Sequence, residues 1–149
     1  MAYEQFTAEN TALLLIDHQV GTMQLIKNID RELAAKQSIA LAKIRDAVLA
    51  TGRKKLVMAG VTTDVCLIFP AIDAAREGFA VQAVMDASGS PSDLSEEFSR
   101  QRMHDAGVVL TATNTLMAEI AQDWSTPTGQ QLIGLLFSDV FPALGAGIA

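Results

Sequence analysis

Four short apolar runs, each of strand length, alternate along the chain with longer segments in which apolar residues recur at helical spacing. The runs are Ala12–Ile16, Leu56–Ala59, Phe79–Met85 and Val108–Thr111. Apolar runs of this kind, interrupted only by Gln82 in the third and ending at Thr111 in the fourth, are typical of strands buried on both faces. Strands that alternate with helices pair in parallel through right-handed crossovers, with helices on both faces. The sequence therefore predicts an α/β fold, a Rossmann-like three-layer α/β/α arrangement around a parallel sheet with four recognisable strands.

Capping residues and glycines mark the helices between these strands. Thr62 and Thr63 are expected to cap a helix that starts at Asp64, is kinked at Pro70 and ends at Gly78. The other expected helices are Arg31–Ala50 after a cap at Asp30, a helix from Ser92 through Ala106, and a helix from Asn114 to Asp123. Residues Asp86–Pro91 are expected to form a turn at the carboxyl edge of the sheet, where active sites of such folds lie.

Length and composition predict a single domain in a reducing compartment. The chain has 149 residues, half of them apolar, one cysteine and a net charge of −6. One cysteine excludes an internal disulfide, and the amino terminus lacks the pattern of a secretory signal, so we expect a cytoplasmic protein. The acidic balance argues against nucleic acid as a partner, and no apolar stretch is long enough to span a membrane.

The chain divides into a domain over residues 1–124 and an apolar tail over residues 125–149. The tail is weakly patterned and predicts one short helix followed by a Gly/Ala-rich end. Its apolar surface suggests packing on a neighbouring subunit, and hence a homo-oligomer, although packing on its own domain is nearly as good an interpretation.

Cys66 is expected at the edge of the sheet where parallel α/β proteins have their active sites. It lies in the first expected helical turn after the strand Leu56–Ala59, and sites in open α/β sheets lie beyond the carboxyl ends of the strands. The N–H groups and positive dipole of a helix amino end favour a thiolate over a thiol and can bind a developing oxyanion. The alternative is a small buried hydrophobic residue, as cysteines commonly are.

Asp17 follows the first strand directly and is expected on the same sheet edge as Cys66. A carboxylate at this place can be a general base, a metal ligand or a cap on the following loop. The pairing with a cysteine favours the general base.

With these residues in view, the chain resembles the isochorismatase-like cysteine hydrolases, and in particular their small oligomeric bacterial members of unassigned substrate. The resemblance covers Thr11 to about Trp124. It rests on the first strand with Asp17, on Gly60–Cys66 as the nucleophile motif, and on Ala74–Phe79 and Met85–Gly89.

The resemblance implies a catalytic set of aspartate, lysine and cysteine. Asp17 would accept the thiol proton, Cys66 would attack a carbonyl carbon, and water would then release the product. The peptide bond between Val61 and Thr62 would be cis, with the N–H groups of Thr62 and Cys66 forming an oxyanion hole. No cofactor is implied.

The chain departs from this family between its first helix and the cysteine strand. Relatives carry two further strands and the catalytic lysine there, whereas this chain passes directly from Ile44 to Arg45. One crossover unit takes about 30 residues, for which there is no room. A shortened protein, an incomplete record and strands supplied by a partner all remain open. Lys27 is the favoured substitute for the lysine over Lys43, although a solvated surface lysine is the commoner case.

No metal site is expected, because His18 and His104 have no second histidine at useful spacing. The leading hypothesis is a hydrolase of a small amide, imide or ester, with Cys66 as nucleophile and Asp17 as base, impaired by the loss of its lysine. The alternatives are an inactive oligomeric scaffold of the same fold and a sensor in which the Cys66 thiol is reversibly oxidised.

Overall fold

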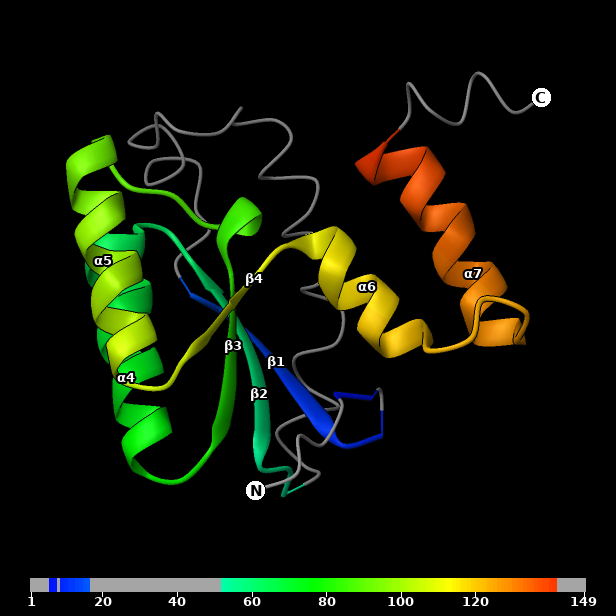
Figure 1. Ribbon diagram of the computed structural model, residues 1–149, viewed down its shortest axis with the longest axis horizontal. Helices are drawn as coiled ribbons and strands as arrows, with labels where there is room; N and C mark the ends of the chain where they lie inside the picture. The colour runs from blue at the N-terminus through cyan, green and yellow to red at the C-terminus, as the bar shows by residue number, and fades with distance from the viewer. Residues whose placement is uncertain (1–5, 8, 17–51, 142–149) are drawn as a thin grey trace.

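The computed structural model describes residues 6, 7, 9–16 and 52–141 (Figure 1). Several residues singled out above lie outside this part of the chain: Asp17, His18, Lys27, Lys43, the expected helix over 31–50 and the junction of Ile44 with Arg45.

The four predicted strands are confirmed and form one parallel sheet in the order β1-β2-β3-β4. They are β1 (Thr11–Ile16), β2 (Lys55–Gly60), β3 (Ala80–Val84) and β4 (Val109–Thr111). Ile16 pairs with Gly60 at the carboxyl ends of β1 and β2. Because all strands run the same way, the segments that follow them meet at one edge of the sheet.

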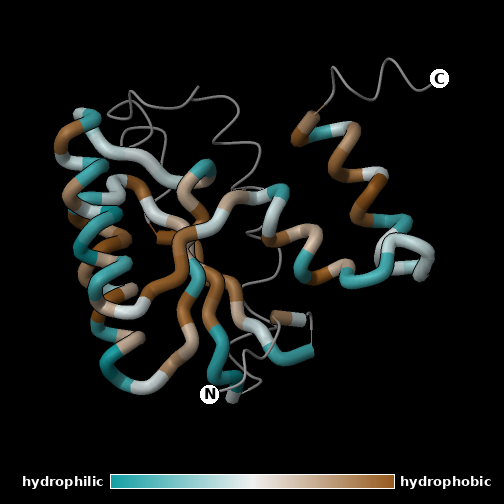
Figure 2. The backbone as a smooth tube through the Cα atoms, in the orientation of Figure 1, coloured by the Kyte–Doolittle hydropathy of each residue, from teal (hydrophilic) through white to brown (hydrophobic). Residues whose placement is uncertain are grey.

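Helices cover both faces of the sheet, as expected (Figure 1). Successive strand side chains point to opposite faces, so Met58 packs with α4 (Ile68–Arg76) and α5 (Asp93–Asp105), whereas its neighbours Val57 and Ala59 face α6 (Thr113–Ala121). The apolar segments gather in the strands at the centre of Figure 2. The structure therefore has the predicted α/β architecture with three layers.

The ends of α4 and α5 follow their sequence signals. Gly78 and Gly107, just beyond the two helices, have φ of 86° and 87°, a left-handed conformation that glycine adopts without steric cost. The Ser92 hydroxyl caps α5 by accepting a hydrogen bond from the Ser95 amide at 3.2 Å.

The start of α6 corrects the expected cap at Asn114. The helix begins at Thr113, whose amide and hydroxyl both donate to Asp86 Oδ1, at 2.8 and 2.9 Å. A carboxylate from the end of β3 thus supplies the acceptor that a local side chain was expected to supply, and the helix also ends earlier, at Ala121.

The start of the cysteine helix also differs from the expectation. Residues Thr63–Leu67 form a π-helical turn before α4, and neither threonine side chain caps it. The π-helical turn ends at Leu67, and Pro70 is the third residue of α4. The irregular backbone thus lies just before Pro70 in the chain.

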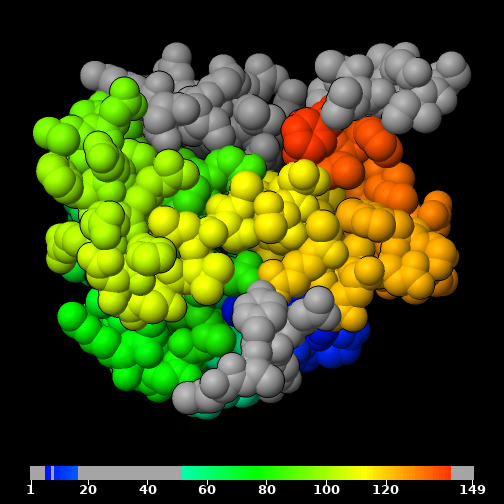
Figure 3. All heavy atoms as spheres, viewed as in Figure 1, coloured from blue at the N-terminus to red at the C-terminus, as the bar shows by residue number. Residues whose placement is uncertain are grey.

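The carboxyl-terminal region forms α7 (Pro127–Leu135) and a π-helical turn, η3 (Leu136–Val140). Both contact α6, and α7 lies beside α6 on the face shown in Figure 3. The described part of the tail thus packs on its own domain. No helix among the described residues is long and apolar enough to cross a membrane.

Candidate active site

Cys66 lies in the π-helical turn that leads from β2 into α4, at the carboxyl edge of the sheet. Its side chain is partly buried, and its amide donates to the carbonyl oxygen of Thr62 at 2.8 Å. The predicted position of the cysteine, just beyond a central strand and in the first turn of a helix, is therefore confirmed.

The turn packs directly on the end of β2. A Cβ atom at Gly60 would lie 3.0 Å from Leu67 Cβ and 3.3 Å from the Leu67 backbone. A side chain at this position would be closer to its neighbours than almost all real Cβ atoms are, so the turn would have to shift slightly to admit one. Gly60 thus fixes how near the cysteine turn comes to the sheet.

The peptide bond between Val61 and Thr62 is cis. Val61 is fully buried, and its amide donates to the carbonyl oxygen of Ile16 at 3.0 Å, which joins the end of β1 to the residue after β2. The Thr62 carbonyl accepts from Cys66 and, at 3.3 Å, from Leu67. By contrast, no acceptor within the described residues lies in hydrogen-bonding geometry to the Thr62 amide.

The segment after β3 fixes the cysteine turn from the other side. Ser88 is fully buried; its hydroxyl donates to the Val84 carbonyl at 2.7 Å and accepts from the Gly60 amide at 3.2 Å. The Thr63 amide donates to the Gly89 carbonyl at 2.8 Å. Sequence reasoning placed this turn at the right edge but missed Ser88, because a serine in a turn gives no sign of its long-range partners.

Buried hydroxyl groups without a hydrogen-bond partner lie beside the cysteine turn. The Thr63 and Ser90 side chains are fully buried, and neither hydroxyl oxygen has a hydrogen-bond partner in the part of the chain that the structure describes; the same holds for one buried carboxylate oxygen of Asp64. Buried polar atoms are normally hydrogen-bonded. This edge of the sheet is thus polar, enclosed and incompletely satisfied.

The other predicted site residue, Asp17, lies outside the described residues. It follows Ile16 in the chain, and the Ile16 carbonyl is bonded to Val61 five residues before the cysteine. Whether its carboxylate reaches Cys66 stays a prediction.

Metal-ligating side chains do not gather in the described part of the chain, where no three of the His, Cys, Asp and Glu residues are arranged to hold an ion. His104 is exposed near the end of α5 and lies 3.5 Å from the Asp105 carboxylate.

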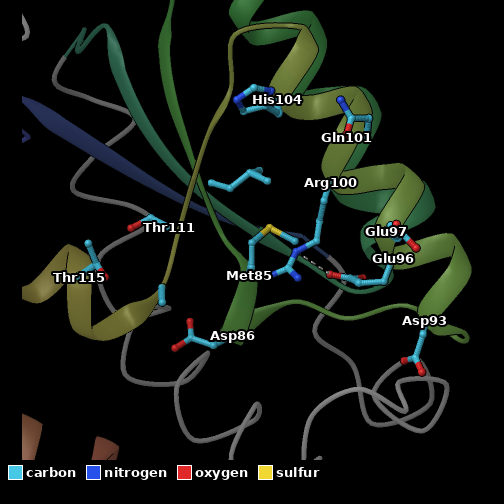
Figure 4. A pocket seen from close by; sticks show the side chains of 12 residues that line it. Met85, Asp86, Asp93, Glu96, Glu97, Arg100, Gln101, His104, Thr111 and Thr115 are labelled. Carbon is cyan, nitrogen blue, oxygen red and sulfur yellow. Dashed lines mark ion pairs between the residues drawn. The ribbon is translucent and has the colours of Figure 1, made fainter.

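A separate groove opens between α5 and β4, with a volume of about 1170 Å³ (Figure 4). Met85 and Asp86 line it from the end of β3, and Glu96 and Arg100 line it from α5. Within the described residues the buried Glu96 carboxylate has no hydrogen bond, and Arg100 Nε lies 3.9 Å from its Oε1. Cys66 does not line this groove.

The family follows from comparison with known proteins. The isochorismatase domain matches residues 36–115, which is more than half of the chain. The chain belongs to the isochorismatase family. The match includes the Cys66 turn, the Ser88 segment and all of α5.

Among its relatives, the probable hydrolase YcaC of Escherichia coli K12 is 26% identical over 190 residues, covering 94% of this chain and 90% of the relative. Because the alignment is longer than the chain, it contains positions of the relative with no residue opposite them here. Isochorismatase family protein 2B of Dictyostelium discoideum is 30% identical over 119 residues and 80% of this chain, which spans about half (51%) of that protein.

Two solved structures show the same fold. YcaC from Pseudomonas aeruginosa, with hexane-2,5-diol and covalent acrylamide, matches with a TM-score of 0.86 and 25% identity, over 99% of this chain and 97% of that one. The E. coli YcaC structure, described as an octameric hydrolase of unknown specificity, matches with a TM-score of 0.79 and 26% identity, over 96% and 94%.

Proposed function

We propose that the protein is a cysteine hydrolase of a small amide, imide or ester, with Cys66 as nucleophile and Asp17 as general base. The observation that carries the proposal is the position of Cys66 in a tight turn at the carboxyl end of β2, where its amide donates to the Thr62 carbonyl. Membership of a hydrolase family supports the reaction class.

In the proposed reaction, Asp17 accepts the thiol proton and the Cys66 sulfur bonds to the carbonyl carbon of the substrate. The carbonyl oxygen becomes an oxyanion, and the amine or alcohol then leaves with a proton. Water hydrolyses the resulting thioester, which restores the thiol and releases the acid. A positioned base and a hydrogen-bond donor to the oxyanion each lower the barrier.

The contacts of the turn favour Thr62 over Cys66 as the donor to the oxyanion. The Cys66 amide already donates to the Thr62 carbonyl at 2.8 Å, so it could serve an oxyanion only by sharing its hydrogen. The Thr62 amide has no acceptor within the described part of the chain. An unused backbone donor beside a nucleophile is what an oxyanion hole requires.

The relatives support covalent chemistry and self-association. Acrylamide is an electrophile that adds to thiols, and it is bound covalently in the P. aeruginosa YcaC structure. The E. coli YcaC structure is octameric and its specificity is unknown. We therefore propose a small-molecule substrate and a homo-oligomer for this chain as well, without naming a substrate.

We further propose that the chain lacks an internal segment that contains the catalytic lysine of related hydrolases. The support is the alignment with E. coli YcaC, which runs over 190 positions against a chain of 149 residues. Because the members of a catalytic set act together, we expect turnover to be low even where the thiol is reactive.

The test is the rate at which iodoacetamide alkylates Cys66 between pH 5 and 9, followed by mass spectrometry of the intact chain. Since Cys66 is the only cysteine, Cys66→Ser is the blank. We expect fast alkylation near neutral pH in the wild type and at least about tenfold slower alkylation in Asp17→Asn.

Alkylation of both proteins at the rate of an unstructured cysteine peptide would overturn the proposal and favour an inactive scaffold. Reversible oxidation of Cys66 by hydrogen peroxide, without turnover of any amide or ester, would favour the thiol sensor instead.

A further inference from the structure

The groove between α5 and β4 contains the buried carboxylate of Glu96. This residue lies in the first turn of α5, and its side chain is only 7% exposed. Neither of its carboxylate oxygens has a hydrogen-bond partner among the described residues. Figure 4 shows the side chain extending from α5 toward Met85, which lines the groove from the end of β3. The carboxylate therefore points into the groove and lacks donors there.

Arg100 does not supply the missing hydrogen bonds. Its Nε atom lies 3.9 Å from Glu96 Oε1, which is beyond hydrogen-bonding distance, and its side chain is 52% exposed. A guanidinium group that is half in solvent is screened, so it can move at a small cost in free energy. A ligand could therefore donate to the Glu96 carboxylate without any hydrogen bond to Arg100 having to break.

The position of Glu96 does not serve the stability of the fold. Acidic side chains near a helix amino end favour the helix, but Asp93 in the same turn does so while it stays exposed to solvent. Glu96 has lost its contact with solvent, and a buried charge with a poorly placed partner adds little or nothing to stability. Such side chains are expected at functional sites, where binding takes precedence over stability.

The charge of the groove favours a cationic ligand. Among the described residues that line it, four carboxylates face the guanidinium of Arg100 and the imidazole of His104: Asp86, Asp93, Glu96 and Glu97. The amino end of α6, which would otherwise attract an anion, already has a carboxylate, because the Thr113 amide donates to Asp86 Oδ1 at 2.8 Å. An anion would therefore be repelled by the acidic side chains and would find this helix end occupied.

The size and lining of the groove favour an organic cation over a bare metal ion. Its volume is about 1170 Å³, and Met85, Leu110 and Ala112 give it an apolar side. In the part of the chain that the structure describes, no three His, Cys, Asp or Glu side chains are arranged to hold a metal ion. A ligand that matches both sides of the groove has a charged N–H donor group and an apolar stem.

We propose that this groove binds a small organic ammonium ion, whose N–H groups donate to Glu96 and whose apolar stem packs against Met85 and Leu110. The three donors of a primary ammonium group are enough to satisfy both carboxylate oxygens, and hydrogen bonds between charged groups are the strong ones. Cys66 does not line the groove, so this site is separate from the nucleophile turn and does not depend on the proposed hydrolase activity.

The first test compares two probes on the wild-type protein by isothermal titration calorimetry. The probes are 2-phenylethylammonium, which is charged at neutral pH as a lysine side chain is, and 2-phenylethanol, its neutral counterpart of similar shape. We expect saturable binding of the amine with a dissociation constant of about 1 mM or lower, and at least about tenfold weaker binding of the alcohol. No saturable binding, or equal binding of the two probes, would overturn the proposal without recourse to any variant.

The second test assigns the amine to Glu96. Glu96→Gln keeps the size of the side chain and removes its charge, so the amine should bind at least about tenfold more weakly. Glu97→Gln is the matched control, because it makes the same change at an exposed position of the same groove, where solvent screening should keep the loss within about twofold. Equal losses in the two variants would overturn Glu96 as the binding group.

The third test separates this site from an anion site and from the nucleophile turn. Arg100→Gln removes a competing positive charge, so it should bind the amine at least as tightly as the wild type; weaker binding would overturn the proposed arrangement. A saturating concentration of the amine should leave the rate of Cys66 alkylation by iodoacetamide unchanged. Protection of Cys66 would place the amine at the nucleophile turn and overturn the groove as its site.

Discussion

The nucleophile turn and the groove between α5 and β4 lie at the same edge of the sheet but differ in how firmly their polar groups are placed. Around Cys66, hydrogen bonds of 2.7 to 3.2 Å link the ends of β1, β2 and β3 through Val61, Ser88 and Thr63. In the groove, the closest approach of Glu96 to Arg100 is 3.9 Å, and the Arg100 side chain is 52% exposed.

This difference supports the Cys66 turn, rather than the larger groove, as the place of the proposed chemistry. The groove has a volume of about 1170 Å³ but no cysteine among the residues that line it. A reactive thiol needs neighbours that do not move. Substitutions at the nucleophile turn should therefore lower both stability and thiol reactivity, whereas substitutions of Glu96 or Glu97 in the groove should lower neither.

The largest effect is expected from Gly60→Ala. The added Cβ atom would lie 3.0 Å from Leu67 Cβ, so the cysteine turn must move away from β2. We expect a loss of about 2 to 3 kcal/mol in the free energy of unfolding, measured with urea, and several-fold slower alkylation of Cys66.

Gly134→Ala is the control for Gly60→Ala, because nothing lies within 4 Å of a Cβ atom at Gly134 in α7. It should be neutral or stabilise the protein by up to about 1 kcal/mol. Equal stability of the two variants would mean that the turn does not depend on close packing against the strand.

The next effect is expected from Ser88→Ala, which removes the hydroxyl between β2 and β3 and leaves the buried Gly60 amide without its acceptor. A buried donor without a partner costs about 1 to 2 kcal/mol in unfolding free energy. Cys66 alkylation should slow as well, because Gly60 packs directly against Leu67, the residue after Cys66. Ser138→Ala, which changes an exposed serine of η3, should change neither quantity; slow alkylation there too would indicate a general loss of structure.

Local signals in the sequence were sufficient to predict the positions of the strands and of several helix ends. Apolar runs located all four strands, and Gly78, Ser92 and Gly107 marked helix ends correctly, because these residues act on their own neighbours. The same local signals placed Cys66 at the carboxyl end of β2.

Long-range contacts could not be predicted in the same way. The cap of α6 comes from Asp86, 27 residues earlier, and the acceptor for the Gly60 amide is Ser88, 28 residues later. Such partners depend on which loops the sheet brings together, and a single sequence does not record this. The proposed oxyanion donor is a related case. The sequence suggests the amides of both Thr62 and Cys66, and only the hydrogen bond from the Cys66 amide to the Thr62 carbonyl favours one of them over the other.

For Glu96→Met in the groove we expect a smaller effect, and a gain rather than a loss in the free energy of unfolding. The buried Glu96 carboxylate has no hydrogen bond among the described residues and only a long contact, 3.9 Å, with Arg100. An apolar side chain of similar volume should therefore leave the stability unchanged or raise it by about 1 kcal/mol. Glu97→Met, at an exposed position of the same groove, serves as the control. A marked loss of stability, or slower alkylation of Cys66, would contradict the view that the groove and the nucleophile turn are independent.

The smallest effect concerns Asp123, between α6 and α7 and remote from the nucleophile turn in sequence. Hydrogen bonds from the Ser125 hydroxyl and amide, at 2.7 and 2.8 Å, lower the pKa of this exposed carboxyl below its usual value. A lowered pKa in the folded state gives a stabilisation that is present above the pKa of the unfolded chain and is lost as the pH falls through the folded value.

The variant Asp123→Asn cannot titrate at this position. The Tm of the wild type, followed by circular dichroism, should therefore fall slightly more than that of the variant between about pH 6 and pH 3. Equal losses would show that the Ser125 contacts do not favour the ionised carboxylate. Alkylation of Cys66 should be the same in both proteins at neutral pH, because this turn shares no hydrogen bond with the segments that fix the cysteine.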